Sequence, residues 1–118
     1  MDELLPKSEL IKHGISADVL LIKFKEQLLK DFEMSNVEIH LNSENKNSIE
    51  EIQSSLIPSI KQIPLGVLQQ LLYRIDISEK QLSEAYIKEK NSDRNEVIAT
   101  LIIKRILQKV ILKIVYSK

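Results

Sequence analysis

The feature that most constrains the fold is the pattern of residues 94–116, a continuous helical repeat whose apolar face changes sides halfway along. At 100° per residue, the two halves collect their aliphatic residues on opposite sides. The two sets are Val97, Ile98, Leu101 and Ile102, then Ile103, Ile106, Leu107, Val110 and Ile114. A helix of about 24 residues is about 36 Å long, whereas a compact chain of this size has a radius of gyration of about 13 Å. We therefore expect this helix to need partners on two sides.

Cations interrupt the aliphatic pattern. Arg105, Lys109 and Lys113 occupy, in the second half, the side that is apolar in the first half. Together with Lys104 they leave no uncharged run of about 18 residues, so we expect no membrane span.

The sequence allows three interpretations of this helix. In the first, it is the central helix of a small bundle, with neighbours on both faces. In the second, its later half forms the seam of a homodimer, because four residues follow the spacing of a coiled coil. These are Ile103, Leu107, Val110 and Ile114. In the third, it is a basic amphipathic helix that binds nucleic acid or a membrane surface.

The neutral net charge of the chain conceals an asymmetry. Residues 94–118 carry six cations against Glu96, a net charge of +5, so the remainder of the neutral chain carries −5. Residues 31–51 account for that deficit, with six acidic residues against Lys46. The two regions are complementary and could meet within one chain or between two.

The composition is that of a single globular domain. Of its 118 residues, 43% are hydrophobic and 29% are charged, and only five are aromatic, so the core must be aliphatic. Cysteine is absent, which excludes disulfides. The acidic start, interrupted by Pro6, lacks the basic and apolar regions of a signal peptide. We therefore expect one cytoplasmic domain spanning residues 1–118.

Local signals divide the chain into five or six helices. A helix over residues 7–13 should end at Gly14, with Ile15 folding back over it in a Schellman motif. Ser16 should then cap a helix of about 18 residues. The later helices should begin at capping residues or capping boxes. These are Ser48 with Glu51, Ser78 with Gln81, and Ser92 or Asp93.

Two prolines and a glycine mark the middle of the chain. Pro58 should end or kink its helix, because proline has no N–H to donate and biases Ile57 away from helical geometry. Pro64 should stand at or near the first position of the next helix. Gly66, in the first turn of that helix, lowers its stability by about 1 kcal/mol relative to Ala. A glycine in this turn also allows a neighbour to pack closely against the helix.

Residues 37–41 show the only alternating pattern in the chain. Val37, Ile39 and Leu41 alternate with polar residues, which predicts a short strand. A strand needs a pairing partner, so the alternative fold is α+β with this strand paired. The other possibility is that the preceding helix simply continues.

Candidate catalytic and metal-binding residues are few. His13 lies at a helix C-terminus, where a cation is favourable, and His40 lies on the polar side of the predicted strand. The spacing of His40 with Glu38 and Glu44 matches no zinc or calcium motif. With two glycines in the chain, a phosphate-binding loop is absent. We expect no enzymatic activity, no metal and no cofactor.

The sequence therefore predicts a mainly α protein, a small bundle of five or six helices with a long C-terminal helix. We expect it to act by binding itself, as a homodimer, or another protein. The residues expected at that contact are Ile103, Leu107, Lys109, Val110, Lys113, Ile114 and Tyr116. The alternative function is weak nucleic-acid binding through the basic side of the last helix.

Overall fold

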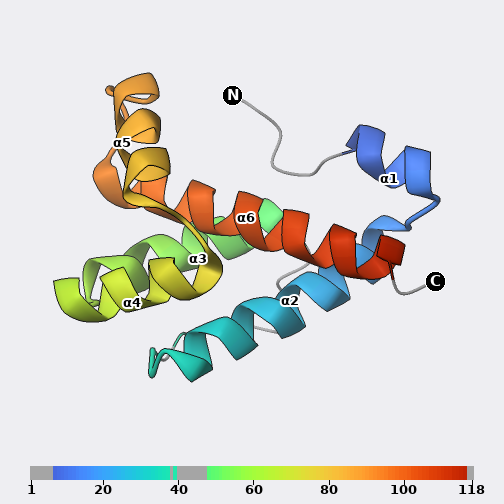
Figure 1. The fold of residues 1–118 in the computed structure, drawn as a ribbon, viewed down its shortest axis with the longest axis horizontal. Coiled ribbons are helices and arrows are strands. Elements are labelled where there is room, and N and C mark those ends of the chain that lie inside the picture. Colours follow the sequence, from blue (N-terminus) through green and yellow to red (C-terminus); the bar gives the residue numbers. More distant parts are fainter. Residues whose placement is uncertain (1–6, 38, 40–47, 117–118) are drawn as a thin grey trace.

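The computed structural model of the chain describes residues 7–37, 39 and 48–116. These residues form six helices and no strand, which confirms the predicted mainly α bundle with a long C-terminal helix (Figure 1). The helices are α1 (Lys7–His13), α2 (Ala17–Met34), α3 (Ile49–Lys61), α4 (Leu65–Ile75), α5 (Glu79–Lys88) and α6 (Arg94–Tyr116).

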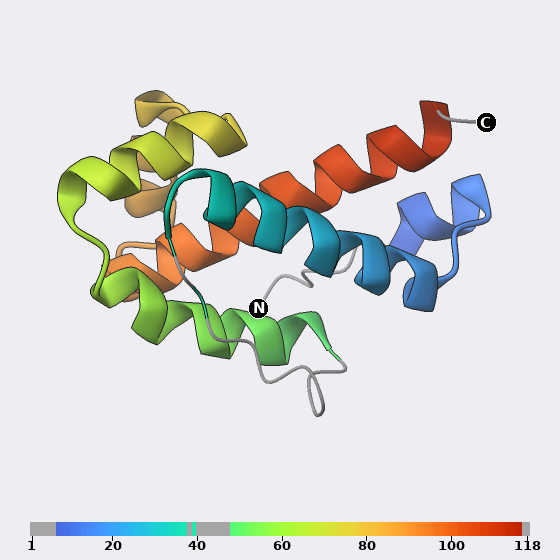
Figure 2. The same ribbon diagram turned by 90° about the horizontal axis from the view of Figure 1, so that it is seen from below.

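Helix α6 is the axis of the bundle. It contacts α2, α3, α4 and α5, and it runs along the long dimension of a molecule that measures 38 × 30 × 25 Å. In Figure 1, α5 lies beside the first half of α6 and α2 beside the second half, and in Figure 2 α2 crosses in front of α6 while α3 lies below it. Both halves of the helix are therefore covered, as expected for the central helix of a bundle.

The hydrophobic core is aliphatic and continuous. Residues from both apolar faces of α6 join one buried cluster with residues of α2, α3 and α4. The α6 members are Ile98, Ala99, Ile102, Ile103, Ile106, Leu107, Val110 and Ile111. The apolar face of α6 thus changes sides because the helix packs against different helices of the same chain along its length.

Three helices end in a Schellman motif, in which one residue turns into the left-handed region and the next folds back on the helix. The motif at the end of α1 was predicted, with Gly14 at φ 64° and the Ile15 N–H donating to the Leu10 carbonyl over 2.9 Å. At the ends of α2 and α4 the left-handed residues are Asn36 and Asp76.

The predicted helix starts are confirmed at the residues that the structure describes. The Ser16 and Ser48 hydroxyls accept backbone N–H groups three residues ahead. Ser78 and Gln81 form the full reciprocal capping box. Asp93 is the residue that opens α6, since its carboxylate accepts the N–H of Asn95 over 3.2 Å.

The prediction that a helix would end at Pro58 was wrong. Helix α3 continues through Pro58 to Lys61, and Ile57 stays helical. The physical reason is burial: Leu56 and Ile60 lie one turn apart in the core, and Pro58 between them is exposed. Burial of two aliphatic side chains outweighs one lost backbone hydrogen bond.

The described part of residues 37–41 does not form the predicted strand. Val37 and Ile39 belong to no helix or strand, while residues 38, 40 and 41 lie outside the described residues. The alternative of a continuing helix was also wrong, because Asn36 adopts φ 58° and the Val37 N–H donates back to the Phe32 carbonyl. Val37 is apolar because it folds onto the core at a helix end.

Candidate functional site

The structure places the predicted contact residues in three environments. Ile103, Leu107 and Val110 are at most 3% exposed and belong to the core of the single chain. Ile114 is partly buried against that core, whereas Tyr116 is 81% exposed. A second copy could reach the first three only if helices of the same chain moved away, so the predicted dimer seam stays a prediction.

The two remaining predicted residues, Lys109 and Lys113, hold α6 against α2. The Lys109 ammonium lies 3.3 Å from a carboxylate oxygen of Asp31, which is only 4% exposed. Gln27 donates its amide to the other Asp31 oxygen over 3.0 Å and accepts from the Lys113 ammonium over 2.7 Å. The complementary charges noted in the sequence therefore meet within one chain at this point.

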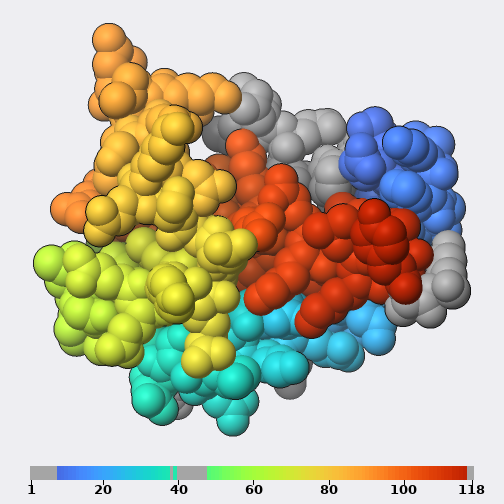
Figure 3. Space-filling view, viewed as in Figure 1, coloured from blue at the N-terminus to red at the C-terminus, as the bar shows by residue number. Residues whose placement is uncertain are grey.

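A groove between the end of α2 and the exposed side of α4 has a volume of about 790 Å³. Figure 3 shows these two elements side by side, with the last turns of α2 in teal beside α4 in yellow-green. The residues that line it are Met34, Ser35, Gly66, Gln69, Gln70, Tyr73 and Arg74. We call it the α2–α4 groove.

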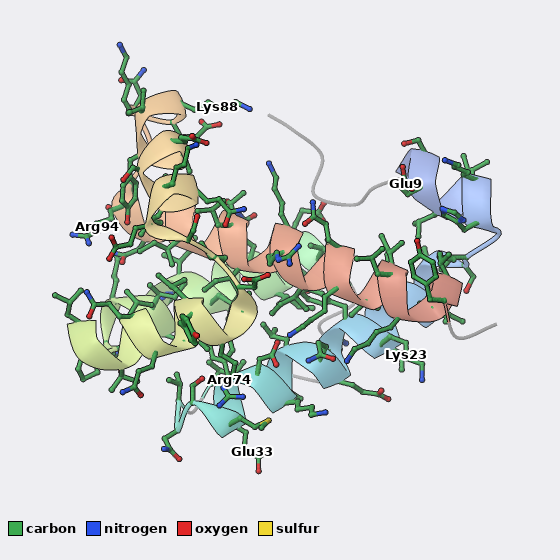
Figure 4. The ribbon with its side chains drawn as sticks, viewed as in Figure 1. Glu9, Lys23, Glu33, Arg74, Lys88 and Arg94 are labelled. Carbon is green, nitrogen blue, oxygen red and sulfur yellow. The ribbon has the colours of Figure 1, made fainter. Side chains whose placement is uncertain are left out.

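Among the described residues that line the α2–α4 groove, Arg74 is the one that carries a charge. Its side chain extends from α4 towards the last turn of α2 (Figure 4). Its guanidinium donates to the sulfur of Met34 over 3.8 Å, and it makes no ion pair with any described residue. Thioether sulfur is a weak acceptor, so a strong donor in the groove lacks a strong partner.

A second hollow, of about 330 Å³, lies where α5 meets the start of α6; Lys90 and Arg94 are both among its described lining residues, and Arg94 is already engaged. Arg94 lies over the ring of Tyr86 at 5.6 Å from the centroid and also donates to its hydroxyl over 3.1 Å. Arg94 therefore has an aromatic ring and a hydroxyl acceptor within the described chain, whereas the hydrogen bond of Arg74 is to a weak sulfur acceptor.

Two residues of the α2–α4 groove lower the stability of the fold. Ser35 is 7% exposed, and its buried hydroxyl has no hydrogen-bond partner among the described residues. A hydroxyl left unsatisfied in the interior costs about 1–3 kcal/mol. Gly66 lies in a regular helix, and a Cβ at that position would meet nothing within 4 Å.

Close packing therefore does not explain Gly66, since a Cβ at that position would meet nothing within 4 Å. The sequence pattern indicated that this glycine is unusual but gave no sign of the groove that it lines. Met34 and Arg74, which form its two walls, are 40 residues apart in the chain. Only the packing of α4 against α2 brings them together.

The structure adds little to the candidate catalytic residues. His13 lies 3.5 Å from the Glu9 carboxylate one turn earlier in α1, and His40 lies outside the described residues. Within the described part of the chain, no group of three or more His, Cys, Asp or Glu side chains could hold a metal ion. None of the helices described there has both the length and the apolarity to cross a membrane.

These observations define a small all-α bundle built around a central C-terminal helix, with an open groove on one side. Compared with known proteins, the chain matches no family model, no curated protein and no solved structure. The function is therefore inferred from the groove itself.

Proposed function

We propose that this protein acts without catalysis, by binding a segment of another protein in the α2–α4 groove. The observation that carries the proposal is Gly66, which weakens a helix without being required by backbone conformation or by a close neighbour. Residues that break a local rule of stability without a folding reason are expected at functional sites. The unsatisfied hydroxyl of Ser35 in the same groove supports this interpretation.

The shape of the groove favours a protein segment over a small molecule. Small-molecule sites typically bury about 70–90% of their ligand, which requires enclosing walls. Here two lining residues are themselves exposed, with Tyr73 at 86% and Met34 at 53%. Tyrosine and methionine are enriched at protein interfaces, and tyrosine is one of the residues that most often contribute strongly to binding there.

The charge of the groove favours protein over nucleic acid. A nucleic-acid site neutralises several phosphates, whereas the described lining of this groove presents one cation, Arg74. Lys109 and Lys113, on which the nucleic-acid alternative depended, are engaged with Asp31 and Gln27 of the same chain. No observation supports that alternative over protein binding.

The test is selection from a random peptide library on the immobilised full chain. Peptides that bind the wild type should lose affinity for Gly66→Leu, whose side chain would occupy the groove. A matched control is Ser83→Leu, which adds the same side chain at an exposed position of α5. The proposal is overturned if no peptide is selected, or if Gly66→Leu binds the selected peptides as well as the control does.

A second candidate is self-association through the outer face of the last turns of α6. Leu112 and Tyr116 are one turn apart on that face and are 50% and 81% exposed. Of the residues predicted at a dimer contact, this surface includes Tyr116 and none of those buried in the core. Light scattering behind a sizing column should then show a dimer that Leu112→Glu dissociates. A monomeric wild type at all concentrations would exclude this candidate.

A further inference from the structure

We propose that the segment bound in the α2–α4 groove presents an acidic side chain to Arg74. This inference rests on the proposed function and specifies the chemistry of the partner. It starts from the state of the Arg74 guanidinium, whose hydrogen bond within the described chain is to the Met34 sulfur at 3.8 Å. Carboxylates bind a guanidinium through two parallel charge-assisted hydrogen bonds, which a thioether cannot match.

The acidic residues near Arg74 do not satisfy it. Asp76, two residues further along, pairs instead with Arg105 of α6 at 2.8 Å. Glu33 lies on the last turn of α2, and Figure 4 shows its side chain directed away from the protein. Neither carboxylate forms an ion pair with Arg74. The place of its strong acceptor is therefore open to a ligand.

Met34 is suited to give way to that ligand. Methionine has three rotatable side-chain bonds, and the Met34 side chain is half exposed, so a carboxylate can replace its sulfur beside Arg74 at little cost. Displacement of Met34 would also uncover the neighbouring Ser35, whose hydroxyl has no partner in the described chain. Gln69 and Gln70 add amide groups along the same wall for the backbone of the segment.

The ligand is assigned to an acidic side chain within a peptide because Tyr73 and Met34, which line the groove, are 86% and 53% exposed, so its walls do not enclose a small ligand. Its anchoring pair is Arg74 with Asp or Glu, flanked by apolar contact with Met34 and Tyr73. A second copy of this chain, which also carries exposed acidic residues, is an outcome that the test separates.

The experiment is a double-mutant cycle on peptides selected against the wild type, synthesised with an acetylated N-terminus and an amidated C-terminus. Replacement of their shared Asp or Glu by Asn or Gln should weaken binding to the wild type by about tenfold or more. The same replacement should have little effect on binding to Arg74→Gln. Arg94→Gln, which removes a cation from the second hollow, should behave as the wild type does.

Glu33→Gln provides an independent arm of the test. Because Glu33 precedes Met34 at the end of α2 and its negative charge would repel an acidic peptide, its removal should strengthen binding of the acidic peptides, by up to about threefold. The amidated ends ensure that the acidic side chain, not a terminal carboxylate, is the group measured.

The inference is overturned if the selected peptides share no acidic position, or if the acid matters equally to the wild type and to Arg74→Gln. Peptides that lack the acid but still lose affinity for Gly66→Leu would overturn the inference and leave the proposed function standing. A concentration-dependent dimer that Arg74→Gln dissociates, with no peptide selected, would identify a second copy as the occupant and overturn both proposals.

Discussion

Replacement of Gly66 and of Gly14 by alanine should change stability in opposite directions. Both glycines face open space, since a Cβ at either position meets nothing within 4 Å. They differ in backbone conformation: Gly66 lies in the first turn of α4, whereas Gly14 has φ 64° at the end of α1. The pair therefore separates the effect of conformation from that of packing.

For Gly66→Ala, the free energy of unfolding should rise by about 0.5–1 kcal/mol, because alanine loses less backbone entropy than glycine when a helix forms. For Gly14→Ala, it should fall by about 1–2 kcal/mol, because a Cβ is disfavoured in the left-handed region. A change of 1 kcal/mol shifts the Tm of a domain of this size by about 4 °C.

The assay is urea denaturation of the full chain followed by circular dichroism, with the denaturation slopes required to stay unchanged. The expected result is a higher midpoint for Gly66→Ala and a lower midpoint for Gly14→Ala. If Gly66→Ala is destabilising, the fold itself requires this glycine, and the reason for assigning it to a binding groove disappears.

Three further predictions concern stability. Leu107→Ala should lower the free energy of unfolding by about 2–5 kcal/mol in urea denaturation, since Leu107 is buried in the core; a change below 0.5 kcal/mol would contradict that burial. Lys109→Met should lower the free energy of unfolding by about 3–5 kcal/mol, because it leaves the Asp31 carboxylate buried without its cation. The double variant Lys109→Met, Asp31→Leu should recover most of that stability, and a double variant as unstable as Lys109→Met would contradict the ion pair. Ser35→Ala should leave stability unchanged or raise it by up to about 1 kcal/mol, and a clear loss would mean that its hydroxyl has a partner.

The helix ends show which parts of the fold the sequence could predict. Four helix ends were recognisable because the capping residue acts on backbone groups within three or four residues of it. Either its side chain accepts a free N–H of the helix or its backbone turns the chain away. The residues are Gly14, Ser16, Ser48 and Ser78. The left-handed residue at the end of α2 was not, because asparagine adopts that conformation only in some contexts. That context is supplied by burial of the residue that follows it.

The neighbours of α6 show where sequence reasoning stops. The change of apolar face correctly required partners on two sides, but a helical pattern does not say whether a partner belongs to the same chain. The deciding element is α2, which brings the buried Asp31 to within 3.3 Å of Lys109. The α2–α4 groove could not be predicted at all, because its walls come from distant segments with no shared motif.

The central claim, that the α2–α4 groove is the binding site, is tested most directly by mapping amide chemical shifts of the full chain as a selected peptide is added. We predict shifts concentrated at residues 34–35 and 66–74, with the hollow around Tyr86 and Arg94 unchanged. Shifts centred on that hollow, or on Leu112 and Tyr116 of α6, would contradict the claim.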